Sequence, residues 1–97
     1  MCTREQCLAK MSASESYLKS EFGVKSLLLF GSMARGDNRI DSDVDVCVDM
    51  PPKAFKVVGL KLYLQELLGA AVDVVRLNPR LDSFLINEIR RDGITVF

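Results

Sequence analysis

Histidine is absent from this 97-residue sequence, and cysteine is scarce. The absence of histidine excludes nucleophilic catalysis of the Ser-His-Asp and Cys-His types. Cys2, Cys7 and Cys47 are an odd number of cysteines without metal-ligand spacing, so neither a disulfide framework nor a zinc site is expected. This cysteine usage fits a reducing cytosol.

Long apolar runs and an excess of charge of one sign are also absent. No run approaches the roughly 18 apolar residues of a membrane-spanning helix, and the first residues lack the apolar region of a signal peptide. Lys plus Arg and Asp plus Glu each number 13, so the net charge is zero. No overall basic field therefore attracts nucleic acid or an anionic membrane. We expect a soluble, cytoplasmic protein, without a membrane partner and with a nucleic-acid partner disfavoured.

The length and apolar content predict one globular domain over residues 1–97. The hydrophobic share is 48%, and a chain of this size buries roughly 60% of its unfolded surface, which is enough for a modest core. The acids are unevenly spread, with five aspartates within thirteen positions: Asp37, Asp41, Asp43, Asp45 and Asp49.

Periodicity and capping residues predict seven elements in the order α-β-β-α-β-α-β. Thr3 and Gln6 have capping-box spacing, and Gly23 and Gly69 are natural helix stops. Asn78-Pro79 suits an N-cap followed by Pro at the first helical position. The predicted helices cover residues 3–22, 53–68 and 79–93, and the predicted strands cover residues 24–30, 43–49, 71–77 and 94–97. The strands at 24–30 and 71–77 read as buried, residues 33–36 as one helical turn, and residues 37–42 as a polar loop.

The predicted fold class is α/β (α+β), with a mixed β-sheet flanked by helices. The helix at 53–68 is long enough for a right-handed crossover, so the strands on either side of it should be parallel. The first two strands can be antiparallel.

The alternation of residues 43–49 places two carboxylates on one face of a strand. Asp43 and Asp45 project side by side, about 6.5 to 7 Å apart, while valines take the core face. Two carboxylates roughly 6 Å apart repel by about 3 kcal/mol at an effective dielectric constant near 20, and a divalent cation would reverse this. Asp73 can complete a three-carboxylate site if its strand lies beside theirs. Oxygen ligands without His or Cys favour Mg²⁺ or Mn²⁺.

Gly31-Ser32 ends the first predicted strand and suits an anion. Glycine lets the backbone approach a phosphate closely, and a serine that opens a helical turn presents a hydroxyl and N–H groups. An anion site beside a cation site is the arrangement that a metal-bound nucleoside triphosphate needs.

Other readings of the same residues explain less. An EF-hand loop would place Val46 at its glycine position and Pro52 at its glutamate position. A P-loop would need Lys-Ser/Thr where the sequence has Asp37-Asn38. A solvent-facing strand whose acids have no role leaves Gly31-Ser32 and Asp73 unexplained.

The spacing of G31-S32, ten residues and D43-V44-D45 resembles the signature of the nucleotidyltransferase superfamily related to DNA polymerase β. More narrowly, G-S-M-A-R-G-D…S-D-V-D-V and L-G-A-A-V-D-V-V resemble the minimal nucleotidyltransferases, the MNT or MntA-like group. The resemblance extends over nearly the whole chain.

The resemblance implies a role for each residue of the motif. Asp43 and Asp45 would bind two metal ions, and Asp73 would bind one of them and help to activate the attacking hydroxyl. Gly31 and Ser32 would hold the β and γ phosphates of ATP. Arg35 would touch phosphate or, as we favour, brace the turn.

The resemblance also implies in-line attack by a hydroxyl on the α-phosphate, with release of pyrophosphate. Similar proteins are commonly encoded beside a HEPN-domain toxin, so the leading hypothesis is an antitoxin that adenylylates a tyrosine of such a partner. A binding antitoxin without catalysis and a transferase acting on a small hydroxylated molecule are the alternatives. The intact aspartates argue against a degenerate enzyme. From the resemblance alone, a homo- or hetero-oligomer is expected.

Overall fold

The computed structural model describes residues 3–36 and 43–97. The predicted loop at 37–42, with Asp37 and Asp41, lies outside the described residues, as does Cys2. Within them the chain forms helices and strands in this order: α1 (Arg4–Ala13), α2 (Glu15–Phe22), β1 (Ser26–Phe30), α3 (Gly31–Arg35), β2 (Val44–Asp49), α4 (Ala54–Leu68), β3 (Val72–Arg76), α5 (Ser83–Asp92) and β4 (Ile94–Thr95). None of these helices has the length and apolar composition needed to cross a membrane.

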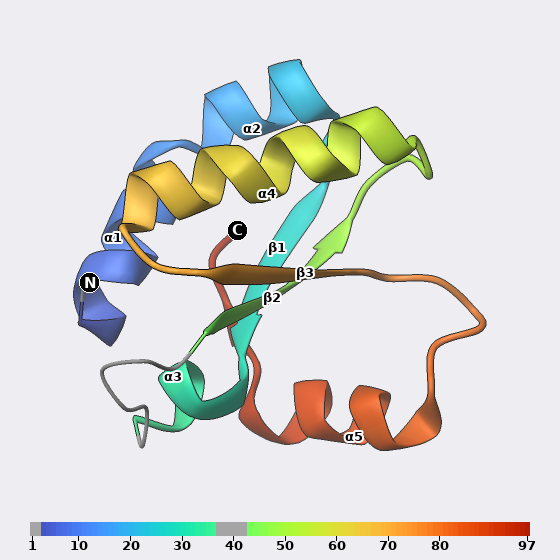
Figure 1. The fold of residues 1–97 in the computed structure, drawn as a ribbon. Coiled ribbons are helices and arrows are strands. Elements are labelled where there is room, and N and C mark those ends of the chain that lie inside the picture. Colours follow the sequence, from blue (N-terminus) through green and yellow to red (C-terminus); the bar gives the residue numbers. More distant parts are fainter. Residues whose placement is uncertain (1–2, 37–42) are drawn as a thin grey trace.

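The strands form one mixed sheet in the order β3-β2-β1-β4 (Figure 1). β1 is antiparallel to both β2 and β4, and β2 is parallel to β3. The parallel pair is joined through α4, as a crossover connection requires. The predicted mixed sheet, and the predicted direction of the first two strands and of the parallel pair, are confirmed.

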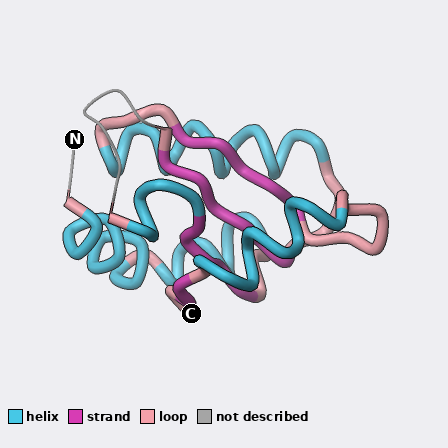
Figure 2. The backbone as a smooth tube through the Cα atoms, turned by 90° about the horizontal axis from the view of Figure 1, so that it is seen from below, coloured by secondary structure: helices cyan, strands magenta, loops and turns pink. Residues whose placement is uncertain are grey.

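The two faces of the sheet are covered unequally. Helices α1, α2 and α4 lie on one face, and α5 lies on the other with the short α3 beside it (Figures 1 and 2). Because side chains alternate along a strand, Val44, Val46 and Val48 all enter the larger core under α1, α2 and α4. The opposite face carries a smaller cluster of Phe30, Cys47 and Ile89. Cys47 is therefore a buried filler on the face that carries Asp45.

The predicted helix over residues 3–22 is wrong in its continuity, since it is divided into α1 and α2 at Ser14. The capping box at its start is confirmed, with Thr3 and Gln6 each accepting from the other's backbone N–H. Ser14 leaves helical geometry, with φ −93° and ψ 5°. Its nearly buried hydroxyl donates to the Lys10 carbonyl and lies 3.2 Å from the Tyr63 hydroxyl of α4. This tertiary contact explains the break, which apolar spacing alone does not reveal. With α3 as a separate helix, the observed order is α-α-β-α-β-α-β-α-β.

The prediction of a helix beginning at Asn78-Pro79 is also wrong. Asn78 Oδ1 accepts from the Arg80 N–H in a turn. Helix α5 begins at Ser83, and the side chain of its N-cap residue Asp82 accepts from the Phe84 N–H.

The prediction of a buried third strand is also wrong, because β3 is an edge strand. Val72 is its one buried residue.

Candidate active site

Asp45 and Asp73 lie directly opposite one another on the parallel strands β2 and β3. Phe30, the last residue of β1, is opposite Asp45 on its other side. The two aspartates therefore share the face of the sheet that α5 covers. Asp43 comes immediately before β2, two positions from Asp45. Asp45 is partly buried, whereas Asp43 and Asp73 are exposed.

The carboxyl group of Asp45 is the electrostatic centre of this cluster. Partial burial and the charges of Asp73, Asp43 and Glu88 raise its pKa from 3.8 to about 6, with burial the largest cause and Arg35 acting in the opposite sense. Burial disfavours the charged form, and like charges nearby do the same. The site accordingly holds more negative charge than it neutralises by itself.

Gly31 lets the backbone pass directly over this carboxyl group. Its φ is +75°, a left-handed conformation that costs other residues about 1–2 kcal/mol. A Cβ at this position would contact the Asp45 carboxylate, with its Cγ only 3.2 Å away. Ser32 follows in the first turn of α3, and Phe30 at the N-cap supplies no side-chain hydrogen bond to that turn. The sheet pairing thus brings the predicted Gly31-Ser32 turn against the predicted carboxylate strand.

Arg35 joins α3 to α5. Its Nη1 lies 3.1 Å from Asp92 Oδ2 and 3.8 Å from Glu88 Oε1. On the other side of the turn, Arg4 Nη1 donates to the Ala34 carbonyl at 3.1 Å. These contacts favour the bracing role for Arg35, while a contact with phosphate stays a prediction.

Glu88 is the charged neighbour that the sequence reasoning missed. It comes from α5, the helix that covers this face of the sheet, and its charge raises the pKa of Asp45. The available signal was its position in α5, three residues after Leu85 and next to Ile89, both of which pack against the sheet. The spacing of Glu88 from Leu85 and Ile89 does not by itself show that Glu88 is near Asp45, because this depends on how α5 packs against the sheet.

The donor set suits a hard divalent cation. Asp43, Asp45 and Asp73 offer only oxygen ligands, and the pKa of Asp45 is raised by burial first and then by neighbouring carboxylates, whose repulsion a cation would relieve. Within residues 3–36 and 43–97, however, no three Asp, Glu or Cys side chains stand close enough to hold an ion as they are. The pairing of Asp45 with Asp73 is observed, and the three-carboxylate metal site stays a prediction.

The sequence matches one family model, described as polymerase beta nucleotidyltransferase, over residues 14–97. The protein adenylyltransferase MntA of Thermococcus cleftensis is 36% identical over 98 residues, which cover 99% of this chain and 98% of that protein. Both matches span the Gly31-Ser32 turn and all three aspartates.

Solved structures share the same architecture. A minimal nucleotidyltransferase superposes with a TM-score of 0.73 at 32% identity, covering 97% of this chain and 96% of that one. A second similar structure is an MNT antitoxin in complex with the tri-AMPylated HEPN toxin of Shewanella oneidensis. It gives a TM-score of 0.63 at 19% identity and covers 89% of this chain and 68% of that one. At that identity the second likeness is one of fold.

Proposed function

This chain belongs to the polymerase beta nucleotidyltransferase family, and from this premise we propose that it transfers AMP from ATP to a hydroxyl group of a HEPN-domain toxin and so acts as its antitoxin. The relative at 36% identity is a protein adenylyltransferase, and a protein of the same fold occurs with an AMPylated HEPN toxin. The acceptor we propose is a tyrosine hydroxyl of the partner.

One observation carries the proposal for this chain. Asp45 pairs in register with Asp73 on one side and lies against Gly31 on the other. A carboxylate pair directly beside a backbone turn without a Cβ can hold the cationic and the anionic parts of a metal-bound triphosphate at the same time.

We propose that Asp43, Asp45 and Asp73 hold Mg²⁺, with Mn²⁺ as a substitute. Two such ions, when bound, would neutralise the triphosphate and stabilise the charge on the attacking and leaving oxygens. Gly31 lets the backbone approach the β and γ phosphates, and Ser32 offers them its hydroxyl and N–H groups.

In the proposed transfer step, Asp73 takes the proton of the attacking hydroxyl group. The acceptor oxygen forms a bond to the α-phosphorus while the bond from that phosphorus to the bridging oxygen breaks, and pyrophosphate leaves. The acceptor proton goes to the Asp73 carboxylate, directly or through water, since Asp73 is the exposed carboxylate of the pair. A protein acceptor can reach this position because β3 is at the edge of the sheet.

The proposal is tested with α-labelled ATP, Mg²⁺ and a purified HEPN-domain protein as the candidate partner. We expect label on the partner with wild-type protein and none with the Asp43→Asn/Asp45→Asn variant. Partner that is inhibited equally by both proteins without label would indicate the binding antitoxin instead. Label that appears only on an added small hydroxylated compound would indicate the other alternative.

A further inference from the structure

Helix α4 is apolar on its outer face as well as on its inner face. Leu60, Leu64 and Leu68 fill the core, as expected for a surface helix. On the outer side, Phe55 is 94% exposed, Val58 54% and Leu62 58%. Their spacing of three and four residues places them on one stripe. A contiguous exposed apolar stripe marks an interaction site more often than isolated exposed residues do.

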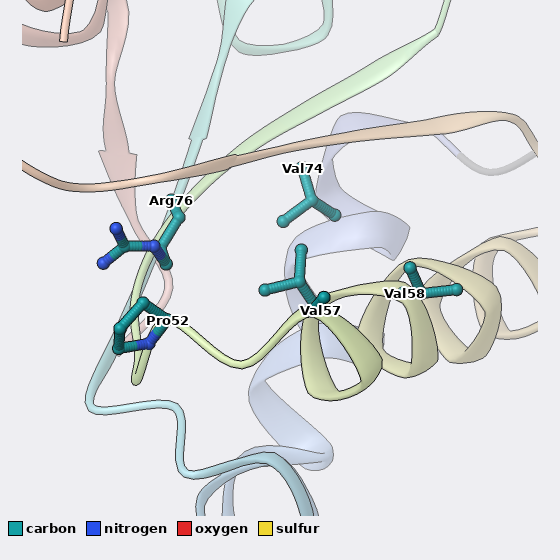
Figure 3. Close-up of a pocket in the computed structure, with 6 residues that line it drawn as sticks. Pro52, Val57, Val58, Val74 and Arg76 are labelled. Carbon is teal, nitrogen blue, oxygen red and sulfur yellow. The ribbon is translucent and has the colours of Figure 1, made fainter.

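A hollow of about 380 Å³ lies beside this stripe. Val57 and Val58 of α4 form one wall, and Val74 and Arg76 of the edge strand β3 form the other (Figure 3). Pro52 closes one end. The hollow and the three stripe residues Phe55, Val58 and Leu62 together are called the α4 outer surface below. The hollow is large enough to receive a protruding side chain.

The rim of the α4 outer surface is basic. The charged residues of α4 and its N-cap are Lys53, Lys56, Lys61 and Glu66, and Arg76 is at the hollow, so cations outnumber acids four to one; Glu66, four residues after Leu62, continues the line of the stripe in the last turn. Among the described residues no ion pair involves any of these four cations. Lys56 Nζ donates to the backbone carbonyl of Glu21, which is a neutral acceptor and not a carboxylate. An occupant with acidic residues beside an apolar stripe would match this charge.

We propose that the α4 outer surface docks an amphipathic helix of the partner protein, with Asp or Glu flanking the apolar stripe of that helix. The inference rests on the proposed function only for the identity of the partner. A second copy of this chain would bring two basic rims together, which is unfavourable. A bilayer would cover the stripe but would not fill the hollow.

The position of this surface leaves the candidate active site accessible. Asp45 and Asp73 project to the face covered by α5, while Val74 and Arg76 project to the face covered by α4. The edge strand β3 contributes to both faces, so a partner bound across this edge can contact the α4 outer surface and still present a hydroxyl near Asp73. Substitutions in the α4 outer surface should therefore change affinity for the partner rather than the chemical step.

The test is calorimetric titration of the purified HEPN-domain partner into the wild-type chain and into single variants. We expect Phe55→Ser and Leu62→Ser each to raise Kd about tenfold or more, as buried apolar anchors do. Lys61→Glu should raise Kd about threefold to tenfold and reduce its dependence on salt. Phe84→Ser is the matched control, since Phe84 is 75% exposed on α5, and its Kd should equal that of wild type. In transfer assays the α4 variants should raise KM for the partner and leave kcat unchanged.

The results that would refute the docking surface differ from those that would refute AMP transfer to the partner. If wild type labels the partner and Phe55→Ser, Leu62→Ser and Lys61→Glu bind it with unchanged Kd, the docking surface is refuted while the function stands. If wild type binds with the expected sensitivity but transfers no AMP, the function fails and the docking surface stands. A wild-type dimer dissociated by Phe55→Ser in sedimentation, or binding to phosphatidylserine vesicles lost in the same variant, would assign the surface to another occupant and overturn the proposal.

Discussion

Asp45 is the residue at which the strands and the turn of the candidate site meet. It is opposite Asp73, two positions from Asp43, under the backbone of Gly31, and within the field of Glu88. A carboxylate in these surroundings is costly to ionise without a cation. The same residue therefore links metal binding, protein stability and pH.

Asp45 gives a pH dependence of stability with a definite sign. Its pKa is 3.8 unfolded and about 6 in the folded protein, so between these values the folded state binds more protons and the free energy of unfolding falls as pH rises. Asp45→Asn lacks this contribution. In metal-free urea titrations, we expect the stability of Asp45→Asn relative to wild type to increase from pH 4 to pH 6 and then to remain constant. A relative stability that is flat or decreases over that window would contradict the assignment.

Gly31→Ala separates a steric effect from backbone strain. We expect a loss of stability of about 1–3 kcal/mol from the left-handed backbone and loss of most transfer activity, because the new Cβ displaces the Asp45 carboxylate. Gly69→Ala is the matched control, since its φ is +67° and, apart from the neighbouring residues of the same turn, no described residue lies within 4 Å of the place that an added methyl group would occupy. It should lose stability while retaining transfer. Equal activity of the two variants would remove the Gly31–Asp45 contact from the mechanism.

Asp73→Asn tests the proposed proton acceptor. We expect transfer to fall by about 10²- to 10⁴-fold, as for loss of a general base, with unfolding free energy within about 0.5 kcal/mol of wild type because the side chain is exposed. The pKa of Asp45, followed by NMR, should move down, since the Asp73 charge helps to raise it. Wild-type transfer rates would remove Asp73 from the site.

The sequence predicts these residues to different extents. Alternation along β2 alone separates Asp45 from the buried valines, because side-chain direction in a strand is local. The partnership with Asp73 depends on β2 and β3 being parallel, which the crossover helix predicted, and on their being adjacent, which the sequence left as a condition and the sheet pairing supplies. Glu88 could not be found in this way, because its place near Asp45 depends on how α5 packs against the sheet.

At the scale of elements, the contact between α3 and α5 fixes the turn that follows β1. Helix α3 has five residues, too few to be stable alone, and it is held by Arg35 to Asp92 and by Arg4 to the Ala34 carbonyl. The carboxylate of Asp92 also pairs with Arg91. The end of α5 thus supports the start of the proposed phosphate site.

Asp92→Asn should loosen this support without unfolding the chain. We expect KM for ATP to rise about threefold to tenfold with a smaller change in kcat, since a less ordered turn binds phosphate less well. Glu15→Gln is the matched control, because it removes an ion pair to Lys19 that lies on α2. Steady-state kinetics with ATP as the varied substrate would show the difference. An unchanged KM for Asp92→Asn would mean that α5 does not position the turn.

The elements were predicted best where local chemistry decides them. The capping box at Thr3 and the left-handed glycines Gly23 and Gly69 mark helix ends through their own backbone. The break at Ser14 depends on Tyr63 of a distant helix. The start of α5 was placed too early because Asn78-Pro79 forms a turn, and Asp82 provides the cap.

At the scale of the whole molecule, the sheet has one heavily covered face and one lightly covered face. Three helices and the larger core stabilise the first, while α5 and a small cluster around Cys47 cover the second (Figure 1). The candidate site is on the second face, and its edge strand β3 has no further strand beside it among the described residues. This arrangement suits an enzyme that acts on a large acceptor.

The most direct test of the central claim compares ATP labelled at the α-phosphate with ATP labelled at the γ-phosphate. The HEPN-domain partner, Mg²⁺ and the wild-type chain are incubated with each, and the partner is then separated and analysed by intact mass. Adenylyl transfer predicts label on the partner from the α position only, a mass increase of one AMP for each transfer, and release of the γ label in pyrophosphate. Label from the γ position, or an inhibited partner of unchanged mass, would contradict the account.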